Sequence, residues 1–514
     1  MELIGISKAF GPVQANRDIH LRVEPGTIHG IVGENGAGKS TLMSILYGFY
    51  SADAGEIRVR GERRRIDSPQ DAIAAGIGMV FQHFKLVDTM TVVENIILGA
   101  EDGPLLRPSL ARARETLARL EREYELEVDP DALVETLSVG LQQRVEILKA
   151  LYRQADILIL DEPTGVLTPA EADHLFRILR NLRDQGKTII LITHKLREIM
   201  EVTDRVSVMR RGEIVATLDT AATSPEELAE LMVGRKVLLR VHKTPAKPGE
   251  PVLEVRDLRA ADDSGVERLK GVSFTVREGE IVGIAGVAGN GQTELLEVLG
   301  GIRAGRGQVR VNGAELPLGE ASGQLVREMG VAHVPEDRQR QGLILEFPAW
   351  ENMALGYHRE PEYDRGWGLI DQRRLRAETA ERMKRYDVRP PDHRLKARSF
   401  SGGNQQKLVV AREMERHPEL LLVGQPTRGV DIGAIEFIHQ RLIDLRDAGK
   451  AILLVSVELD EIMSLADRIL VMFDGRIMGE RLPAETDEQE LGMLMAGVAA
   501  PAAPDAAPTP EALP

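Results

Sequence analysis

The chain has 514 residues, enough for two or three domains, and its 43% hydrophobic and 28% charged residues are typical of a soluble globular protein. Cysteine is absent, which excludes disulfides, thiolate nucleophiles and cysteine-ligated metals. A net charge of −15 and an aromatic content of 4% disfavour nucleic-acid binding over the whole surface and a base-stacking platform. The start MELIGISKAF has no basic segment followed by an apolar one, and no run reaches about 18 apolar residues. We therefore expect neither a secretory leader nor a membrane span.

The first recognisable unit is a strand, a glycine-rich turn and a helix. GTIHGIVG predicts a buried strand, GENGAGKST fits G-x-x-x-x-G-K-[ST], and STLMSILYGF has a helical pattern. In such a loop the backbone N–H groups hold phosphates, Lys39 adds a positive charge and Ser40 offers a hydroxyl to Mg²⁺. A plain turn is the alternative, which the flanking strand and helix disfavour. The candidate nucleotide-binding residues here are Gly33, Glu34, Asn35, Gly36, Ala37, Gly38, Lys39, Ser40 and Thr41.

Later in the chain, buried strands end in polar side chains. ADILILDEP ends in Asp161 and Glu162, and TIILITH ends in His194. Asp161 is the natural partner of Mg²⁺, and Glu162 is the natural group to polarise an attacking water, although a helix cap with a solvated neighbour is the alternative. His194 is expected at the same crevice, because ligands bind at the carboxyl ends of parallel strands. Gln82 follows the short apolar run GMVF; on chemistry alone, it and His194 could each be a loop residue.

Between these strands, LSVGLQQR precedes a helical pattern. Ser138 and Gly140 at a helix N-terminus can form an anion site. Taken alone, this stretch favours a simple helix cap.

The chain is a tandem repeat. GENGAGKS matches GVAGNGQT, LSVGLQQR matches FSGGNQQK, DEPTGVLT matches GQPTRGVD and LITHKLREIM matches LVSVELDEIM. The offset is 253 between the phosphate loops (286 − 33) and 263 between the signatures (401 − 138), so the second copy gained about ten residues. We place them in HREPEYDRGWGLIDQRR. Strand–helix alternation predicts a parallel sheet in each copy.

The repeat defines the expected domains. The first spans residues 1–235 and the second spans 252–497, with a Pro- and Lys-rich linker over 236–251. The Ala/Pro tail, residues 498–514, is predicted to be disordered.

Both copies resemble the nucleotide-binding domain of ATP-binding-cassette (ABC) proteins. The shared order is phosphate loop, glutamine loop, LS-G-QQ signature, Asp-Glu strand and histidine strand. The resemblance implies an α/β fold with two tandem ABC ATPase domains of the P-loop NTPase fold. Each would have a parallel core sheet, an antiparallel β subdomain and a helical subdomain. It also implies ATP and Mg²⁺ as cofactors and two cassettes packed head to tail, so that each nucleotide lies between one phosphate loop and the other signature.

The resemblance also implies residue roles. Phe10 matches the aromatic residue that stacks on adenine, with a core residue as the alternative. Gln82 matches the residue that senses Mg²⁺ and contacts the permease, and His194 matches the switch residue at the γ-phosphate. The expected catalytic set is Lys39, Gln82, Glu162 and His194, and the expected metal set is Ser40, Gln82 and Asp161. The signature completing this site is expected from the second copy: Ser401, Gly402 and Gly403.

The second copy has lost the chemical side chains. Lys39, Gln82, Asp161, Glu162 and His194 are replaced by Gln292, Glu336, Gly424, Gln425 and Val457. We expect no useful hydrolysis there, because losing one electrostatic stabiliser typically costs about a hundredfold in rate. The first signature has Val139 where the second has Gly402, so the altered loop and altered signature are expected to share one degenerate site that can still hold nucleotide. Its candidate residues are Gly286, Gly291, Gln292, Thr293, Ser138 and Gly140.

The fused pair with a modified second half looks like the ATPase subunit of simple-sugar and nucleoside importers. FQHFKLVDTMTVVENIILG, SGGNQQK and QPTRGVDIGAIEFIH look most like bacterial nucleoside (guanosine-type) importers. The resemblance implies two transmembrane permease subunits, an extracytoplasmic substrate-binding lipoprotein, a peripheral place on the cytoplasmic face of the cell membrane, and no nucleic-acid partner. It implies docking through the segment between Gln82 and Leu137 and its counterpart after Glu336.

Three alternatives remain for the function. The first is a ribose- or galactose-type sugar importer. The second is a soluble tandem ABC factor acting on ribosomes, which usually carries a long charged linker and intact catalytic glutamates. The third is a fused exporter, against which the signatures GGNQQK and QPTRGVD speak.

Overall fold

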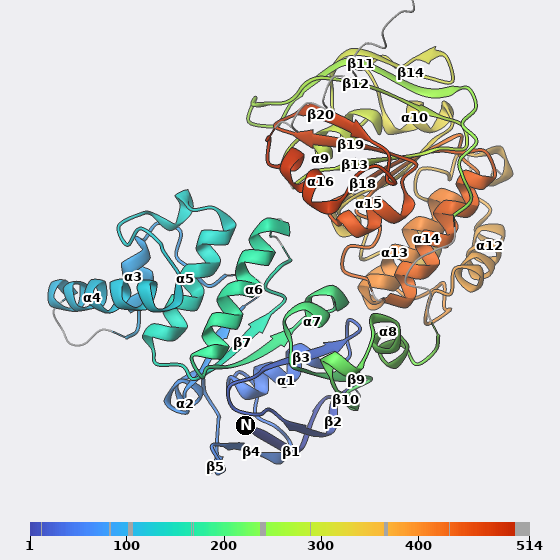
Figure 1. The fold of residues 1–514 in the computed structure, drawn as a ribbon. Coiled ribbons are helices and arrows are strands. Elements are labelled where there is room, and N and C mark those ends of the chain that lie inside the picture. The colour runs from blue at the N-terminus through green and yellow to red at the C-terminus, as the bar shows by residue number, and fades with distance from the viewer. Residues whose placement is uncertain are drawn as a thin grey trace, which may run out of the picture. The chain divides into compact units, whose positions relative to one another are not determined.

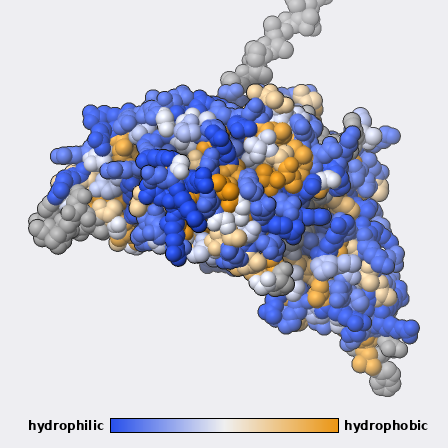
Figure 2. Space-filling view, turned by 90° about the horizontal axis from the view of Figure 1, so that it is seen from below, coloured by the Kyte–Doolittle hydropathy of each residue, from blue (hydrophilic) through white to orange (hydrophobic). Residues whose placement is uncertain are grey.

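The computed structural model (Figure 1) describes residues 1–11, 13–81, 84–100, 106–165, 167, 169–236, 243–287, 289–363, 369–430 and 432–498. The chain divides into two compact units, Met1–Leu239 (unit 1) and Arg240–Pro514 (unit 2). Within the described residues, none of the helices combines the length and the apolar character that crossing a membrane requires. Figure 2 shows a largely hydrophilic face on which apolar residues form small separate patches.

Unit 1 is built on a six-stranded sheet in the order β10-β9-β3-β8-β7-β6. All neighbours pair in parallel except β10, which is antiparallel to β9. The strands are β3 (Ile28–Gly33), β6 (Ile77–Val80), β7 (Ile157–Asp161), β8 (Thr188–Ile192), β9 (Arg205–Arg210) and β10 (Glu213–Asp219). The central strands are buried almost throughout, which explains their continuous apolar runs.

A second, antiparallel sheet of unit 1 has the order β2-β1-β4-β5. Its strands are β1 (Glu2–Phe10), β2 (Val13–Arg22), β4 (Ala54–Val59) and β5 (Glu62–Arg64). Helix α1 (Lys39–Leu46) shares one hydrophobic core with both sheets, through side chains such as Leu42, Ile19 and Ile190. The core therefore fixes the start of α1 between the two sheets.

The remaining helices of unit 1 surround the central sheet or form a helical subdomain. They are α2 (Pro69–Ala74), α3 (Val92–Ile97), α4 (Leu106–Tyr124), α5 (Val139–Tyr152), α6 (Pro169–Asp184), α7 (Leu196–Val202) and α8 (Pro225–Val233), with 3-10 turns at Val134–Thr136 and Thr220–Ala222. Helices α3, α4 and α5 pack together and lie side by side in Figure 1.

Unit 2 repeats the architecture, with sheets in the orders β12-β11-β14-β15 and β16-β17-β18-β13-β19-β20. Its strands are β11 (Pro251–Ala261), β12 (Glu267–Arg277), β13 (Ile281–Ala285), β14 (Arg306–Val311), β15 (Ala314–Glu315), β16 (Val331–Val334), β17 (Leu420–Gly424), β18 (Ala451–Ser456), β19 (Arg468–Phe473) and β20 (Arg476–Arg481). Its helices are α9 (Gln292–Leu299), α10 (Gly323–Glu328), α11 (Ala349–Ala354), α12 (Gln372–Arg385), α13 (Gly402–Met414), α14 (Ile432–Asp447), α15 (Leu459–Leu465) and α16 (Glu488–Met495). Short turns lie at η3 (Arg338–Gly342), η4 (Pro361–Tyr363) and η5 (Ala397–Ser399). The predicted fold class is confirmed, with one antiparallel strand at the edge of each core sheet.

The structure corrects the expected position of the extra residues in the second copy. Asn95 and Asn352 each exchange hydrogen bonds with the backbone eight residues earlier and are equivalent, at an offset of 257 (352 − 95). Gly76 and Gly330 are also equivalent, at an offset of 254 (330 − 76). The carbonyl oxygen of Gly76 accepts from the backbone at the start of β7, and that of Gly330 accepts from the backbone at the start of β17. Three residues therefore enter between these points, where η3 lies, and only six can lie in the stretch where all ten were expected.

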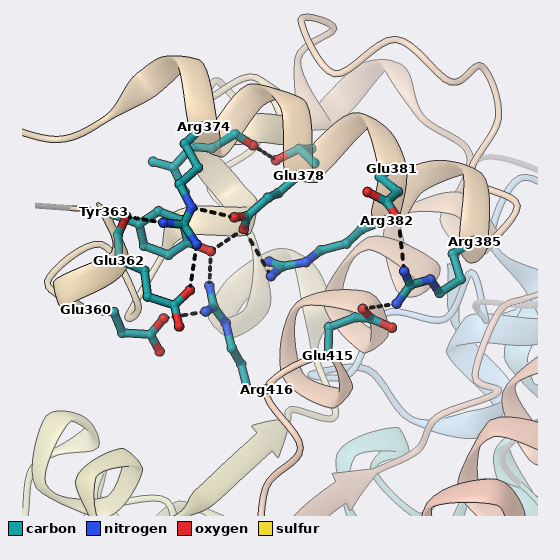
Figure 3. Close-up of polar contacts among 12 residues, drawn as sticks. Glu360, Glu362, Tyr363, Arg374, Glu378, Glu381, Arg382, Arg385, Glu415 and Arg416 are labelled. Carbon is teal, nitrogen blue, oxygen red and sulfur yellow. Dashed lines mark hydrogen bonds and ion pairs between the residues drawn. The ribbon is translucent and has the colours of Figure 1, made fainter.

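That stretch is fastened to the end of α13 by a polar network (Figure 3). Arg416 forms an ion pair with Glu360 and donates to the hydroxyl of buried Tyr363 over 2.9 Å. Tyr363 donates in turn to Glu378 on α12 over 2.6 Å, and Arg374 pairs with the same carboxylate at 2.9 Å. Single exposed ion pairs contribute little, but here they converge on a buried hydroxyl.

Candidate functional site

At two of its glycines, the turn between β3 and α1 has room for backbone but not for a side chain. Gly38 is the N-cap of α1 at φ 100°, and a Cβ there would collide with the carbonyl oxygen of Ala15 on β2. A Cβ on Gly33 would collide with the carbonyl oxygen of Met209 on β9. The N-cap Gly38 has no side chain that could cap α1, which suits the helix start to an anion.

Lys39, the first residue of α1, folds back over this turn. Its side chain is only 6% exposed, and Nζ donates to the carbonyl oxygens of Gly33 at 2.6 Å and Glu34 at 3.1 Å. Burial lowers the pKa of Lys39, against the opposing attraction of Glu162 and Asp161. The ammonium group is thus held inside the loop, where a phosphate bound to the helix start would meet it.

Two neighbouring carboxylates at the end of β7 have different environments. Burial raises the pKa of Asp161 to about 6, and the negative charge of Glu162 adds to this effect. Burial also opposes ionisation of Glu162, but its bond to His194 and the nearby charges outweigh this effect, so that its pKa is lowered. The distance from His194 Nδ1 to Glu162 Oε1 is 2.9 Å.

The backbone at Glu162 is strained in a way that aims its side chain. Its φ is 46°, in the left-handed region, while its N–H donates to the carbonyl oxygen of Ile192 at the end of β8. His194 follows β8 by two residues, so neighbouring strands β7 and β8 present the carboxylate and the imidazole together. The structure therefore brings Lys39, Asp161, Glu162 and His194 into one electrostatic group.

The other predicted residues of this site lie around that group. Ser40 is exposed on the first turn of α1. Phe10 is 42% exposed at the end of β1, in edge contact with Tyr50 at 5.2 Å between ring centroids, so it is not a core residue. Its hairpin contacts the loop, because Asn16 Nδ2 donates to the carbonyl oxygen of Gly38 at 3.1 Å. Gln82 lies outside the described residues.

Unit 2 has the same backbone conformation at the equivalent loop and strand end, but different polar side chains. Gly291 is the N-cap of α9 at φ 105°, and Gln292, 4% exposed, donates from Nε2 to the carbonyl oxygen of Val287 at 3.1 Å. Gln425 has φ 47°, matching Glu162, but its Oε1 accepts from the backbone N–H of Val457 at 3.3 Å. The Gln292 amide therefore donates to the carbonyl group equivalent to the one that Lys39 contacts in unit 1. Gln425 accepts from a backbone N–H, whereas Glu162 is hydrogen-bonded to a histidine side chain.

One carboxylate in unit 2 was not recognised as a site residue from the sequence. Thr293 Oγ1 donates to Glu336 Oε2 at 2.5 Å. A Cβ on Gly424 would lie 2.5 Å from Cγ of Glu336, so the Glu336 side chain stands beside the end of β17. Burial raises the pKa of Glu336, opposed by the bond from Thr293 and the charge of Arg428. The available signal was the loss of an acid at 424 together with the gain of one at 336.

The two signatures have different charged side chains close to their glycines. Ser138 and Ser401 both cap their helices, accepting from Leu141 and Asn404 at 3.4 Å. A Cβ on Gly140 would lie 2.9 Å from Oε1 of Glu171. Both residues line a cavity of about 200 Å³ between α5 and α6.

In unit 2 the charge beside the signature is positive. A Cβ on Gly402 would lie 2.6 Å from Nη2 of Arg338, which the sequence gave no reason to select. Arg338 lies on η3, and its Nη1 donates to the carbonyl oxygen of Arg428 at 2.8 Å. Burial lowers the pKa of Arg338, and within the described ranges no carboxylate forms an ion pair with it.

Comparison with known proteins identifies the family. The family model for the ABC transporter matches residues 16–165 and 269–428, which include both phosphate loops and both signatures. The chain belongs to the ABC transporter family. It is therefore an ABC-type ATPase with two ATP-binding cassettes.

Curated ABC proteins resemble this chain over almost its whole length. It is 49% identical to a nucleoside import ATP-binding protein of Lactococcus lactis subsp. cremoris (strain MG1363), over 97% of this chain and 98% of the relative. It is 50% identical to a guanosine import ATP-binding protein of Bacillus subtilis (strain 168), over 97% of each. A glucose import ATP-binding protein of Haloferax volcanii is 47% identical over 97% of this chain and 96% of the relative.

One solved structure shares the fold over almost the whole chain. A chain in the complex of the archaeal ribosomal stalk protein aP1 and the ribosome recycling factor aABCE1 matches 96% of this ABC protein, and 92% of that chain is covered. The TM-score is 0.62 at 19% identity, which supports the fold alone.

The phosphate loop of this ABC protein makes a testable contrast between two glycines. Gly36 and Gly38 both have positive φ, but a Cβ on Gly36 would meet nothing within 4 Å. We expect Gly36→Ala to cost about 1 kcal/mol from backbone strain, and Gly38→Ala about 3 kcal/mol because β2 must also move. Urea unfolding of both variants measures this difference. Equal losses would contradict the packing described for Gly38.

Proposed function

We propose that the chain is the ATP-hydrolysing subunit of an ABC importer of nucleosides, with one hydrolytic site per chain. The observation that carries this proposal is the group Lys39, Asp161, Glu162 and His194 in unit 1, set against the same backbone in unit 2 without any of the four. The reaction is attack of water on the γ-phosphate of ATP to give ADP and phosphate.

The residues of unit 1 divide the work of this reaction. Glu162 has a lowered pKa, so it is ionised at neutral pH and can polarise and orient the attacking water. Lys39 and the N–H groups at the start of α1 hold the phosphates and balance their charge. His194 is hydrogen-bonded to the Glu162 carboxylate, and we expect it to contact the γ-phosphate.

Mg²⁺ fits the same group. The hydroxyl of Ser40 and the carboxylate of Asp161 are oxygen donors of the kind this cation prefers. Asp161 is buried next to a second carboxylate, and its raised pKa shows that a nearby positive charge would stabilise its ionised form. When bound with ATP, Mg²⁺ would neutralise phosphate charge. Gln82 remains a predicted ligand.

We infer that the signature of unit 2 completes the hydrolytic site of unit 1, and its surroundings support this assignment. The N-terminus of α13 has the guanidinium of Arg338 beside Gly402, which adds a positive charge to an anion-binding helix end. Gly140 has the carboxylate of Glu171 beside it instead. The signature with the positive neighbour is therefore the better match for a γ-phosphate.

A pair of equivalent substitutions tests the single hydrolytic site. Glu162→Gln should lower kcat for ATP by about a hundredfold or more, because the group that polarises water loses its charge. Adding Gln425→Glu to the Glu162→Gln variant should restore no activity, because unit 2 has Gln292 and Val457 in place of Lys39 and His194. Steady-state phosphate release from the assembled transporter measures both. Near-normal activity in Glu162→Gln would overturn the assignment.

A second prediction concerns Arg338. Arg338→Ala should raise KM for ATP about tenfold or lower kcat similarly, through the loss of one charge–phosphate contact. Arg338→Lys should recover part of the loss. Arg340→Ala removes an exposed arginine of the same turn and is the matched control. Equal behaviour of Arg338→Ala and Arg340→Ala would contradict a role for Arg338 at the nucleotide.

The transport role and substrate rest on the relatives. Two of the similar proteins import nucleosides or guanosine, according to their names, and a third imports glucose. We propose two transmembrane permease subunits, an extracytoplasmic substrate-binding protein and a peripheral position on the cytoplasmic face of the membrane. A simple-sugar importer is the alternative, supported by the glucose relative. The ribosome-factor likeness supports the fold alone.

Uptake measurements test the proposed substrate. Cells that express the chain together with its permease and substrate-binding partners should accumulate labelled guanosine, whereas labelled glucose or ribose should not enter above background. The same cells carrying Glu162→Gln should lose the uptake, because transport is coupled to hydrolysis. Sugar uptake without nucleoside uptake would establish the alternative, and uptake unaffected by Glu162→Gln would refute the coupling.

A further inference from the structure

The charge of this ABC protein is distributed unevenly between the helical parts of its two units. Residues 369–400 of unit 2, which include α12, contain ten Lys and Arg and five Asp and Glu residues, a net charge of +5. The corresponding residues of unit 1, 106–137 at the signature offset of 263, contain five basic and eight acidic residues, a net charge of −3. Since the whole chain carries −15, the residues outside 369–400 carry −20 (−15 − 5). Unit 2 therefore has a cationic segment on an otherwise acidic protein.

The basic residues of α12 fall into two groups, of which the first is neutralised within unit 2. Its members form ion pairs with carboxylates of α12, of η4 and at the end of α13 (Figure 3). They are Arg374, Arg382 and Arg385. Their charges are balanced by these partners, and the pairs help to fasten α12 to the segments on which it packs.

The second group, which we call the basic row, consists of Arg373, Arg376 and Lys384. Helical spacing puts these residues on one side of α12, because Arg376 follows Arg373 by three residues and Ala380 and Lys384 continue the row in steps of four. All three basic side chains are exposed, and among the residues that the structure describes no carboxylate forms an ion pair with them. The buried residues of α12 lie on another side of the helix, so the basic row faces solvent.

Apolar side chains lie at the N-terminal end of the basic row. Leu369 and Ile370, directly before the N-cap of α12, are 65% and 41% exposed. The guanidinium carbon of Arg376 lies 4.6 Å from the ring centroid of half-buried Trp350 on α11. Exposed aliphatic side chains, a tryptophan and unpaired Lys and Arg residues together suit the boundary between water and an anionic bilayer. Nucleic acid would need the charges but not the two exposed aliphatic residues.

We propose that the basic row, together with Leu369 and Ile370, binds the anionic phospholipid headgroups of the cytoplasmic leaflet. This inference rests on the proposed function, which places the chain peripherally at that leaflet. The leaflet has a negative surface potential, so it attracts the cationic segment of unit 2 and repels the acidic remainder of the chain. The contact is one-sided, because the corresponding residues of unit 1 carry a net negative charge. Unit 2, which lacks the hydrolytic side chains, thus supplies the contact with lipid.

Co-sedimentation of the purified full chain with protein-free vesicles tests the proposal without any permease. The chain should bind vesicles of phosphatidylcholine that contain about one third phosphatidylglycerol, and binding should weaken as salt is added. Vesicles of phosphatidylcholine alone should bind it far more weakly. The triple variant Arg373→Gln/Arg376→Gln/Lys384→Gln should lower the affinity for the anionic vesicles about a hundredfold, because each basic residue near such a surface contributes about fivefold. Leu369→Ser with Ile370→Ser should lower it as well, by removing apolar surface from the bilayer boundary.

A matched control removes the same charge from another part of unit 2. Three further arginines, on β14 and β20, are exposed and form no ion pair within the described residues. The control is Arg306→Gln/Arg310→Gln/Arg476→Gln, which should bind the anionic vesicles like the wild type. Circular dichroism shows whether each variant is folded. If the triple variant of the basic row is not folded, the dependence of wild-type binding on lipid charge and the variant of Leu369 and Ile370 decide the question.

The outcomes separate this inference from the proposed function. A wild type that binds neither kind of vesicle, or both equally, would overturn the inference, and so would equal losses in the two triple variants. Binding to RNA but not to anionic vesicles, lost in the variant of the basic row, would assign the row to nucleic acid instead. Absence of vesicle binding together with normal guanosine uptake would leave the proposed function intact. Vesicle binding that depends on the basic row, in a chain that supports no uptake, would leave the inference and overturn the transport role.

Discussion

The close approach of backbone to backbone at the turn before α1 and α9 is the constraint on which the rest of the site depends. At Gly38 and Gly291 the chain passes so near to β2 and β12 that a Cβ has no room. This packing fixes the open helix start, and with it the place where an anion binds. Lys39 and Gln292 then fold back onto equivalent carbonyl groups because the space left for them is the same.

Retaining this backbone allowed the two units to diverge in chemistry. The left-handed residue after β7 and after β17 persists, as Glu162 in one unit and Gln425 in the other. At that position the side chain of Glu162 is hydrogen-bonded to His194 in unit 1, and the side chain of Gln425 accepts a hydrogen bond from Val457 in unit 2. A duplicated fold can thus preserve the backbone geometry of a loop while its polar side chains change.

Electrostatics distinguishes the parts of the two units in a consistent way. The helix start that follows the altered signature lies beside Glu171, and the one that follows the intact signature lies beside Arg338. A positive neighbour at the intact signature favours an anion at that helix start. In unit 2 the loop hydroxyl of Thr293 is held by the carboxylate of Glu336.

Much of the fold and of the candidate site follows from the sequence itself. Apolar strands, the glycine-rich loops and the ionisable residues at strand ends are local patterns, so Lys39, Asp161, Glu162 and His194 could be selected as candidates from the sequence. The structure brings these four side chains together, and their catalytic roles stay predictions. The role of Gln82 stays a prediction, since this residue lies outside the described part of the chain.

The tertiary structure alone decided three points, each of which depends on contacts between distant segments. The contact between Glu336 and the end of β17 arises because β16 and β17 are neighbours in the sheet but lie about ninety residues apart in the chain. Arg338 on η3 lies beside Gly402, a contact that no local pattern indicated. Arg416, just after α13, pairs with Glu360, and Arg374 pairs with Glu378, so the segment around Tyr363 is fastened there. A sequence determines which groups are present, whereas packing across the sheet determines which of them meet.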